Sequence, residues 1–197
     1  PVAHIWFLRT VPSKLGLLLN ISVSKLEKVV YYAAYVVTAV DEEQRRGALA
    51  GLEDEVRSSR AAGGADGKLV ADRAENLRSA LSVLKPGLIF TEHEYYLLAE
   101  RFGDVFEADR GAGAVRKLVE ELDLKALERE LLKEFAAVKD QNQEPRLTAR
   151  LRIVQSLLKS GVRPEWMVFT VLPVLPPELR PMVALDGGRY ATADLND

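Results

Sequence analysis

The chain has 197 residues, of which 48% are hydrophobic and 28% are charged, and its formal net charge is −2. A chain of this size buries roughly 70% of its unfolded surface, so it is long enough for one globular domain with an excursion. The near-neutral charge excludes a free-standing basic nucleic-acid-binding domain, so contacts with nucleic acid must be local or shared with other chains. The absence of cysteine excludes disulfides, thiolate zinc sites and cysteine nucleophiles.

The first forty residues predict short elements after an apolar start. Residues 2–8 are apolar, with β-branched and aromatic members, which indicates a buried extended segment. A short helix is expected over 12–19, and a capping-box pattern at 24–27 predicts a second helix with its cap at the first of these residues, a serine. Residues 35–40 then form a strand-like run. Because the chain opens on Pro1 rather than on Met, we expect it to begin within a longer polypeptide.

Residues 41–85 change character, being rich in Glu, Arg, Ala and Leu. Gly63-Gly64 and Gly67 interrupt the helical pattern, which predicts two antiparallel helices joined by a glycine turn. The apolar stripe on these helices is thin, which favours an arm that leans on the body rather than a core element. We interpret this helical hairpin as an insertion.

Four further helices are predicted before the C-terminal segment. A capping box at 91–94 opens the first, and the others are expected over 111–122, 123–138 and 146–160. Gly161 ends the last of them, because glycine adopts the left-handed conformation that closes many helices.

The C-terminal segment predicts extended chain. Residues 166–172 form a strand-like run, and the prolines that follow hold the chain outside a regular ladder. Asp186-Gly-Gly-Arg189 predicts a tight turn, since glycine accepts positive φ. The expected architecture is therefore α+β and mostly α. Its helices would pack on a small sheet formed by the two ends of the chain, residues 2–8 and 166–191, with the helical hairpin inserted.

Three stretches resemble the β′ subunit of bacterial DNA-directed RNA polymerase. The first opens Pro1-Val-Ala-His-Ile-Trp-Phe-Leu8 and continues to Asn20, and the second is Tyr31-Tyr-Ala-Ala-Tyr-Val-Val37. The third and most specific includes Val171-Leu-Pro-Val-Leu-Pro-Pro-Glu-Leu-Arg-Pro-Met-Val183 and Leu185-Asp-Gly-Gly-Arg-Tyr-Ala-Thr-Ala-Asp-Leu-Asn-Asp197. The chain departs from the family where Tyr190 replaces a common Phe and Ala193 a common Ser.

The resemblance implies a fragment of the N-terminal clamp region, the pincer that closes over DNA in an enzyme that copies template DNA into RNA. Residues 184–197 would begin the lid, which lies near the upstream end of the RNA–DNA hybrid and helps to separate RNA from template. The family's zinc-binding cysteines would precede Pro1. Its σ-binding clamp helices and its three Mg²⁺-binding aspartates would follow Asp197. The resemblance thus implies no catalytic residue, metal ligand or cofactor in this chain, and no activity of the fragment alone.

The same resemblance implies partners and a location. The partners would be the rest of β′, the β, α and ω subunits, DNA and RNA in the full enzyme, and σ factor through the neighbouring helices. The location would be the cytoplasm, in association with the nucleoid, without contact to a membrane.

Two groups of residues are candidates for contact with nucleic acid. In the lid, the Arg189 guanidinium suits phosphate oxygens and the Tyr190 ring could stack on a base. The alternative is a plain hairpin turn. On the last predicted helix, basic side chains either contact nucleic-acid backbone or form a solvated face. The candidates are Asp186, Gly187, Gly188, Arg189, Tyr190 and Thr192 in the lid, and Arg146, Arg150 and Arg152 on the helix.

Other residues have structural interpretations. Trp6 and Trp166 are expected to anchor the core, although Trp166, with Phe169 and Leu172, is also a candidate for an apolar patch that neighbouring subunits cover. The acidic pairs of the middle helices lie among lysines and arginines, which favours solvated faces over a catalytic pair. A helical scaffold or interaction protein without a polymerase role stays open as the alternative function.

Overall fold

The computed structural model describes residues 2–3, 5–62, 64–137 and 143–196. Its helices are α1 (Ile5–Leu8), α2 (Lys14–Leu19), α3 (Val23–Val30), α4 (Glu42–Ala62), α5 (Gly64–Ser82), α6 (Glu92–Phe102), α7 (Ala112–Glu120), α8 (Leu124–Ala137) and α9 (Glu144–Ser160), with 3₁₀ turns at Pro164–Met167, Pro177–Leu179 and Asp194–Asn196. Its strands are β1 (Val2–Ala3), β2 (Tyr35–Val40), β3 (Ile89–Phe90), β4 (Phe106–Asp109), β5 (Val168–Phe169), β6 (Met182–Ala184) and β7 (Tyr190–Thr192). The α+β, mostly α class is confirmed.

Strand β2 is the centre of the molecule. It lies between β3 and β4 in an antiparallel sheet, pairing Tyr35 with Phe90 on one side and Val40 with Phe106 on the other. The predicted strand at 35–40 is confirmed at both ends. The flanking strands were not predicted, because two and four residues are too short to show an alternating pattern.

The alternation of β2 divides the core in two. Successive side chains of a strand point to opposite faces. Val36 therefore joins the cluster of α2, α3, α7, α8 and α9, which includes Leu26 and Leu118. Its neighbour Val37 joins the cluster of the helical hairpin, α6 and the sheet edge, which includes Leu52. One strand thus holds a helical body on one face and the arm on the other.

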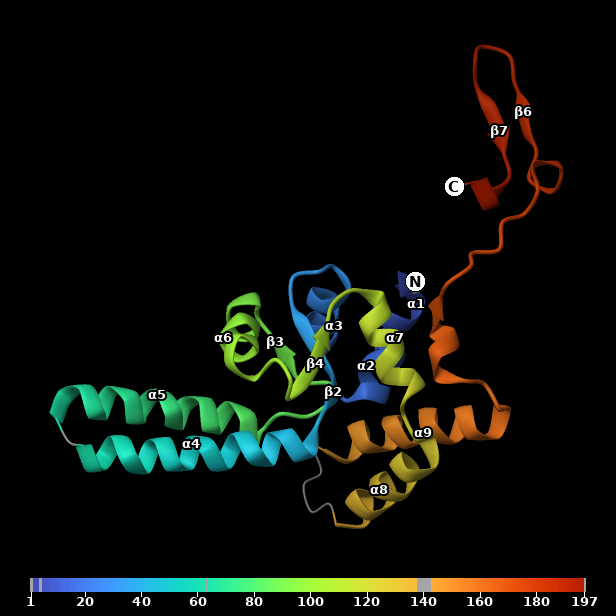
Figure 1. The fold of residues 1–197 in the computed structure, drawn as a ribbon. Helices are drawn as coiled ribbons and strands as arrows, with labels where there is room; N and C mark the ends of the chain where they lie inside the picture. The colour runs from blue at the N-terminus through green and yellow to red at the C-terminus, as the bar shows by residue number, and fades with distance from the viewer. Residues whose placement is uncertain (1, 4, 63, 138–142, 197) are drawn as a thin grey trace.

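The helical hairpin is confirmed, but it is more than a leaning arm. Helices α4 and α5 run antiparallel and project from the body (Figure 1). Leu52, midway along α4, is fully buried, and so are Leu81 in the last turn of α5 and Leu84 just after it, so the expectation that the arm is not a core element is wrong. Nearer the tip Leu69 is 54% exposed. The apolar stripe of the hairpin is thin because only the part of the hairpin nearer the body packs against other elements.

The N-terminal prediction of one extended segment over 2–8 is wrong in its second half. Only β1 is extended, and it pairs with β5 through Val2 opposite Phe169. The two ends therefore form a sheet as expected, although it holds two residues from each. Helix α1 follows because a helical turn lets the neighbours Phe7 and Leu8 both pack on the body, whereas a strand points neighbours apart. His4 and the side chain of Trp6, which was predicted to anchor the core, lie outside the part of the chain that the structure describes.

The cap of helix α3 lies two residues before the predicted one. The Ser22 carbonyl accepts from the amide of Leu26 at 3.0 Å, which makes Ser22 the cap and places Ser24 inside the first turn. The capping box predicted at 91–94 is confirmed. Thr91 and Glu94 form the capping box of α6, and the Asp123 carboxylate accepts from two amides at the start of α8.

The predicted strand over 166–172 is also wrong for most of its length. Pro164 opens a 3₁₀ turn, a position that suits proline, and only Val168–Phe169 are paired. This turn buries Met167 and Glu165 and directs Trp166 outward, where it is 58% exposed. The interpretation of Trp166 as a core anchor is therefore wrong, and its alternative as part of an exposed apolar patch agrees with the structure.

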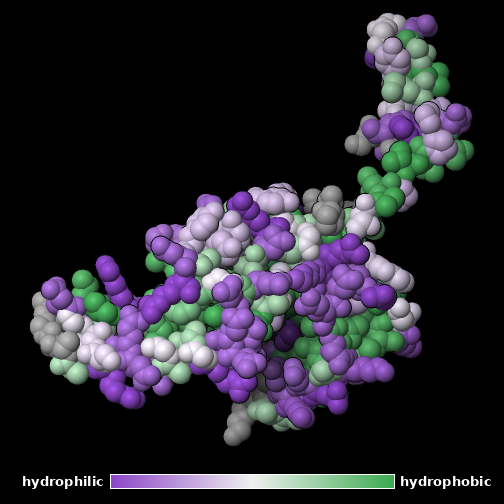
Figure 2. All heavy atoms as spheres, viewed as in Figure 1, coloured by the Kyte–Doolittle hydropathy of each residue, from purple (hydrophilic) through white to green (hydrophobic). Residues whose placement is uncertain are grey.

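Beyond β5 the chain leaves the body. A proline-rich segment runs outward to the β6–β7 hairpin, which stands clear of the helices (Figure 1). Hydrophobic surface covers much of this segment in Figure 2. Val171, Leu172 and Val174 are each more than 70% exposed.

Candidate nucleic-acid interface

The β6–β7 hairpin presents the predicted turn at its tip. Ala184 pairs with Tyr190, and the Leu185 amide donates to the Arg189 carbonyl at 2.7 Å, which closes the loop. Gly187 and Gly188 have φ of +82° and +74°, values that favour glycine over any other residue. The tight-turn prediction for 186–189 is confirmed.

Charge and aromatic surface lie together at this tip. Arg189 and Tyr190 are adjacent, and Tyr190 is 64% exposed. Within the described residues the Arg189 guanidinium has no hydrogen bond and no ion pair with a carboxylate. An unpaired guanidinium beside an open ring can bind a phosphate and stack on a base in one contact.

A polar network closes the foot of the hairpin. The Asn196 amide nitrogen donates to the Thr192 hydroxyl at 2.7 Å and to the Arg180 carbonyl at 3.1 Å, and its oxygen accepts from the Arg180 guanidinium at 2.9 Å. Thr192 was predicted to contact nucleic acid, and its hydroxyl accepts a hydrogen bond within the hairpin. Arg180 and Asn196 were missed because residues 16 apart show no sequence sign of pairing.

The basic residues of α9 divide into two kinds. Arg146 and Arg152 are exposed, and Arg146 donates to the Asn20 side chain at 2.8 Å. Arg150 is only 8% exposed and donates to the Leu17 carbonyl at 2.8 Å, joining α9 to α2. Burial lowers the pKa of this guanidinium, and Arg146 adds to the effect while Glu134 opposes it. Arg150 is therefore a structural bridge, and the remaining candidates on this helix for contact with nucleic acid are Arg146 and Arg152.

The burial of Arg150 could have been predicted from the sequence. It lies three residues after Leu147 and four before Val154, so it falls on the apolar stripe of its own helix. A long side chain on such a stripe must be buried or must extend along it to reach a partner.

The described residues offer neither a metal site nor a membrane-spanning helix. Among the described residues, no group of three or more His, Cys, Asp or Glu side chains is placed to hold a metal ion. Within the same part of the chain, every helix is too short or too polar to cross a lipid bilayer. The acidic pair Glu120 and Glu121 is exposed, which agrees with the solvated face predicted for it, and His93 is exposed too.

Comparison with known proteins agrees with the C-terminal motif. The chain matches the family described as RNA polymerase Rpb1, domain 1, over residues 1–197. It is 39% identical to DNA-directed RNA polymerase subunit beta′ of Dehalococcoides mccartyi, 39% to that of Stenotrophomonas maltophilia and 41% to that of Symbiobacterium thermophilum. All of this chain is covered, but only 17%, 11% and 13% of these relatives. The chain therefore spans less than a fifth of their length, and it belongs to the RNA polymerase Rpb1 domain 1 family.

Proposed function

We propose that this chain is part of the clamp of a DNA-directed RNA polymerase, where it helps to hold template DNA and the RNA–DNA hybrid. In this proposal the β6–β7 hairpin is the start of the lid and aids separation of RNA from template. One observation carries it: at the tip of a hairpin outside the helical body stand an exposed tyrosine and an arginine that has no partner among the described residues. The names of the relatives and the family match favour a polymerase role over the alternative of an unrelated helical scaffold.

The chemistry of the tip fits strand separation. Arg189 would attract a phosphate of the hybrid or of the exiting RNA. Tyr190 would offer a ring to the last base of the hybrid, replacing part of the stacking that this base loses when its partner leaves. Gly187 and Gly188 have open space around them, so backbone there could approach a strand closely.

The remaining parts of the proposal concern the whole enzyme. The chain would contribute no catalytic residue, and it would be inactive without the rest of the nucleotidyltransferase. The Mg²⁺ and Zn²⁺ sites would lie outside it. Its partners would be the rest of β′, the β, α and ω subunits, DNA and RNA, with σ factor bound through neighbouring helices, in the cytoplasm at the nucleoid.

The test uses complete polymerase with Arg189→Ala and Tyr190→Ala in the subunit. We expect stalled elongation complexes to dissociate faster, and RNA displacement from the hybrid to fall severalfold, because phosphate binding and stacking are both lost. Lys159→Ala, which removes an exposed cation from the end of α9, serves as the matched control. Unchanged displacement and complex lifetime in the double variant would count against the proposed role of the hairpin.

A further inference from the structure

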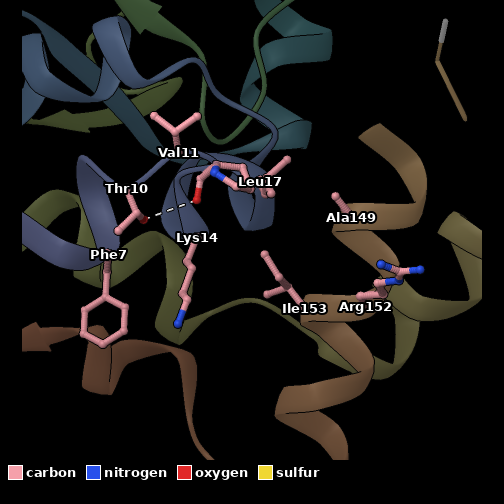
Figure 3. A pocket seen from close by; sticks show the side chains of 9 residues that line it. Phe7, Thr10, Val11, Lys14, Leu17, Ala149, Arg152 and Ile153 are labelled. Atoms are coloured by element: carbon pink, nitrogen blue, oxygen red, sulfur yellow. Dashed lines mark hydrogen bonds between the residues drawn. The ribbon is translucent and has the colours of Figure 1, made fainter. Parts of the chain in front are cut away.

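A second surface lies on the helical body, apart from the hairpin. It is a groove of about 590 Å³ between the start of the chain and α9 (Figure 3). Most of its lining is apolar, and Lys14 and Arg152 are the two cations among the lining residues. The lining residues are Phe7, Thr10, Val11, Pro12, Lys14, Leu17, Ala149, Arg152 and Ile153.

The walls of the groove are held in place before anything binds. The Ser13 hydroxyl donates to the Phe7 carbonyl at 3.1 Å and accepts from the Gly16 amide at 3.1 Å, which fixes the loop between α1 and α2. The buried Arg150 fixes α9 against α2 through the Leu17 carbonyl. A preformed groove loses little conformational entropy when it is filled.

The apolar lining is unusually open at one point. Val11 is 100% exposed at the tip of the loop, and the Thr10 hydroxyl donates to the Pro12 carbonyl at 3.2 Å beside it. Scattered exposed apolar residues are ordinary, but here Val11, Pro12 and Ile153 border one hollow. Such a cluster is typical of a surface that another segment covers.

The charge of the groove indicates what would cover it. Of the described residues that line it none is acidic, and neither Lys14 nor Arg152 has an ion pair with a described carboxylate. Lys14 instead lies over the Phe7 ring, with its amino nitrogen 5.4 Å from the ring centre. The complementary occupant has apolar side chains flanked by carboxylates.

The shape of the groove favours a helix. A second hollow of about 450 Å³ shares Ala149 and Arg152 and continues along α9 to Pro145 and Glu144. From Pro145 to Ile153 a helix rises about 12 Å, which is roughly two helical turns of an occupant lying alongside. Glu144 would repel carboxylates of the occupant at its end of the two hollows. The carboxylates would therefore lie at the Lys14 end, which sets the direction of the occupant.

The size of the groove indicates the source of the occupant. Stable complexes between free proteins engage about 20–30 residues on each side. The nine lining residues of the groove are too few to retain a free partner, but they suit a segment that is delivered at high effective concentration by a covalent tether. The curated relatives supply such a tether, because more than four fifths of their length lies outside the matched region.

We propose that this groove is the docking site for an acidic amphipathic helix from the part of the polymerase subunit that lies outside this chain. Lys14 and Arg152 would bind its carboxylates, and Phe7, Val11 and Ile153 its apolar side chains. The inference requires only that the chain is one part of a longer subunit, so it does not depend on the lid role of the hairpin.

The test places a photo-crosslinking benzoylphenylalanine at Val11 in the complete subunit, assembled into core polymerase without added regulators. We expect a crosslink within the same subunit, to a helical peptide that carries Asp or Glu. Lys14→Glu with Arg152→Glu should lower its yield roughly fivefold or more, because two ion pairs become repulsive contacts. Lys159→Glu on the same helix should leave the yield unchanged.

A milder pair, Lys14→Gln with Arg152→Gln, covers the case in which charge reversal blocks assembly, and the expected loss of yield is then smaller. A crosslink mainly to another subunit, or no crosslink in assembled enzyme, would overturn the proposal. A yield that neither charge pair changes would do the same. Because RNA displacement is not the readout, failure here is separate from failure of the lid proposal.

Discussion

Arg150 shows how a single residue can look like a ligand-binding cation and serve as a structural bridge. Its guanidinium is buried and donates to a main-chain carbonyl of α2. Arg152, two residues along the same helix, is exposed. Arg150 therefore has a structural role, whereas the charge of Arg152 on the same helix is open to solvent.

Arg150→Met is expected to lower the free energy of unfolding of the chain by about 1–3 kcal/mol, because the Leu17 carbonyl loses its side-chain donor in a buried position. Urea unfolding followed by circular dichroism measures this. Arg152→Met is the control, and a change near zero is expected for it. Equal effects of the two substitutions would show that Arg150 is not the bridge.

The capping box of α6 predicts a dependence on pH. Hydrogen bonds from the Thr91 amide and hydroxyl hold the pKa of Glu94 below its usual range. A carboxylate with a lowered pKa stabilises the fold above its unfolded pKa of about 4.3, and this contribution is lost as the pH falls through the folded value. Glu94→Ala should therefore destabilise the chain at pH 7 by about 1 kcal/mol and much less at pH 3.

The same unfolding measurement at both pH values, with the exposed Glu100→Ala as control, checks this expectation. A destabilisation by Glu94→Ala that is equally large at pH 3 would mean that packing, rather than the ionised cap, is responsible.

At the scale of elements, the sequence predicted most helices and the central strand, and it failed where neighbours decide the conformation. Residues 35–40 are rich in aromatic and β-branched side chains, and they are recognisable as a strand on that basis. Residues 5–8 are apolar, but the helical turn that they form depends on contacts outside the segment, such as the hydrogen bond from the Ser13 hydroxyl to the Phe7 carbonyl. Residues 164–167 form a 3₁₀ turn that precedes a strand of only two residues, and this strand pairs with β1 at the other end of the chain. Local propensity carries no record of these contacts.

The candidate interface likewise has one part that was predictable from the sequence and one part that was not. The Asp186-Gly-Gly-Arg189 turn was predictable, because positive φ requires glycine at 187 and 188. The network of Arg180, Asn196 and Thr192 was not, because it joins side chains that come together only after the hairpin forms.

The helical arm offers a prediction at this scale. Leu52 is buried midway along α4, while Leu69 is half exposed near the tip of the arm. Leu52→Ala should lower the free energy of unfolding by about 2–5 kcal/mol, since it leaves a cavity in packed surroundings. Leu69→Ala should cost less than about 1 kcal/mol. Similar costs for both would indicate that the arm is uniformly loose and only leans on the body.

At the scale of the whole molecule, a body with two cores carries an extended segment and a hairpin that contact little of it. The helical body and the arm share β2, so they are joined through one strand. The hairpin stands apart and exposes its apolar connection (Figures 1 and 2). This division suits a domain whose body is a rigid mount and whose exposed parts meet other components of a larger enzyme.

The central claim is that the tip of this hairpin meets the upstream end of the RNA–DNA hybrid. The most direct measurement replaces Tyr190 with benzoylphenylalanine in complete polymerase, stalls the enzyme on a defined template, and maps the crosslinked nucleotides after irradiation. The account predicts crosslinks to RNA or template at the upstream end of the hybrid. Crosslinks only to protein, or only to downstream duplex DNA, would contradict it.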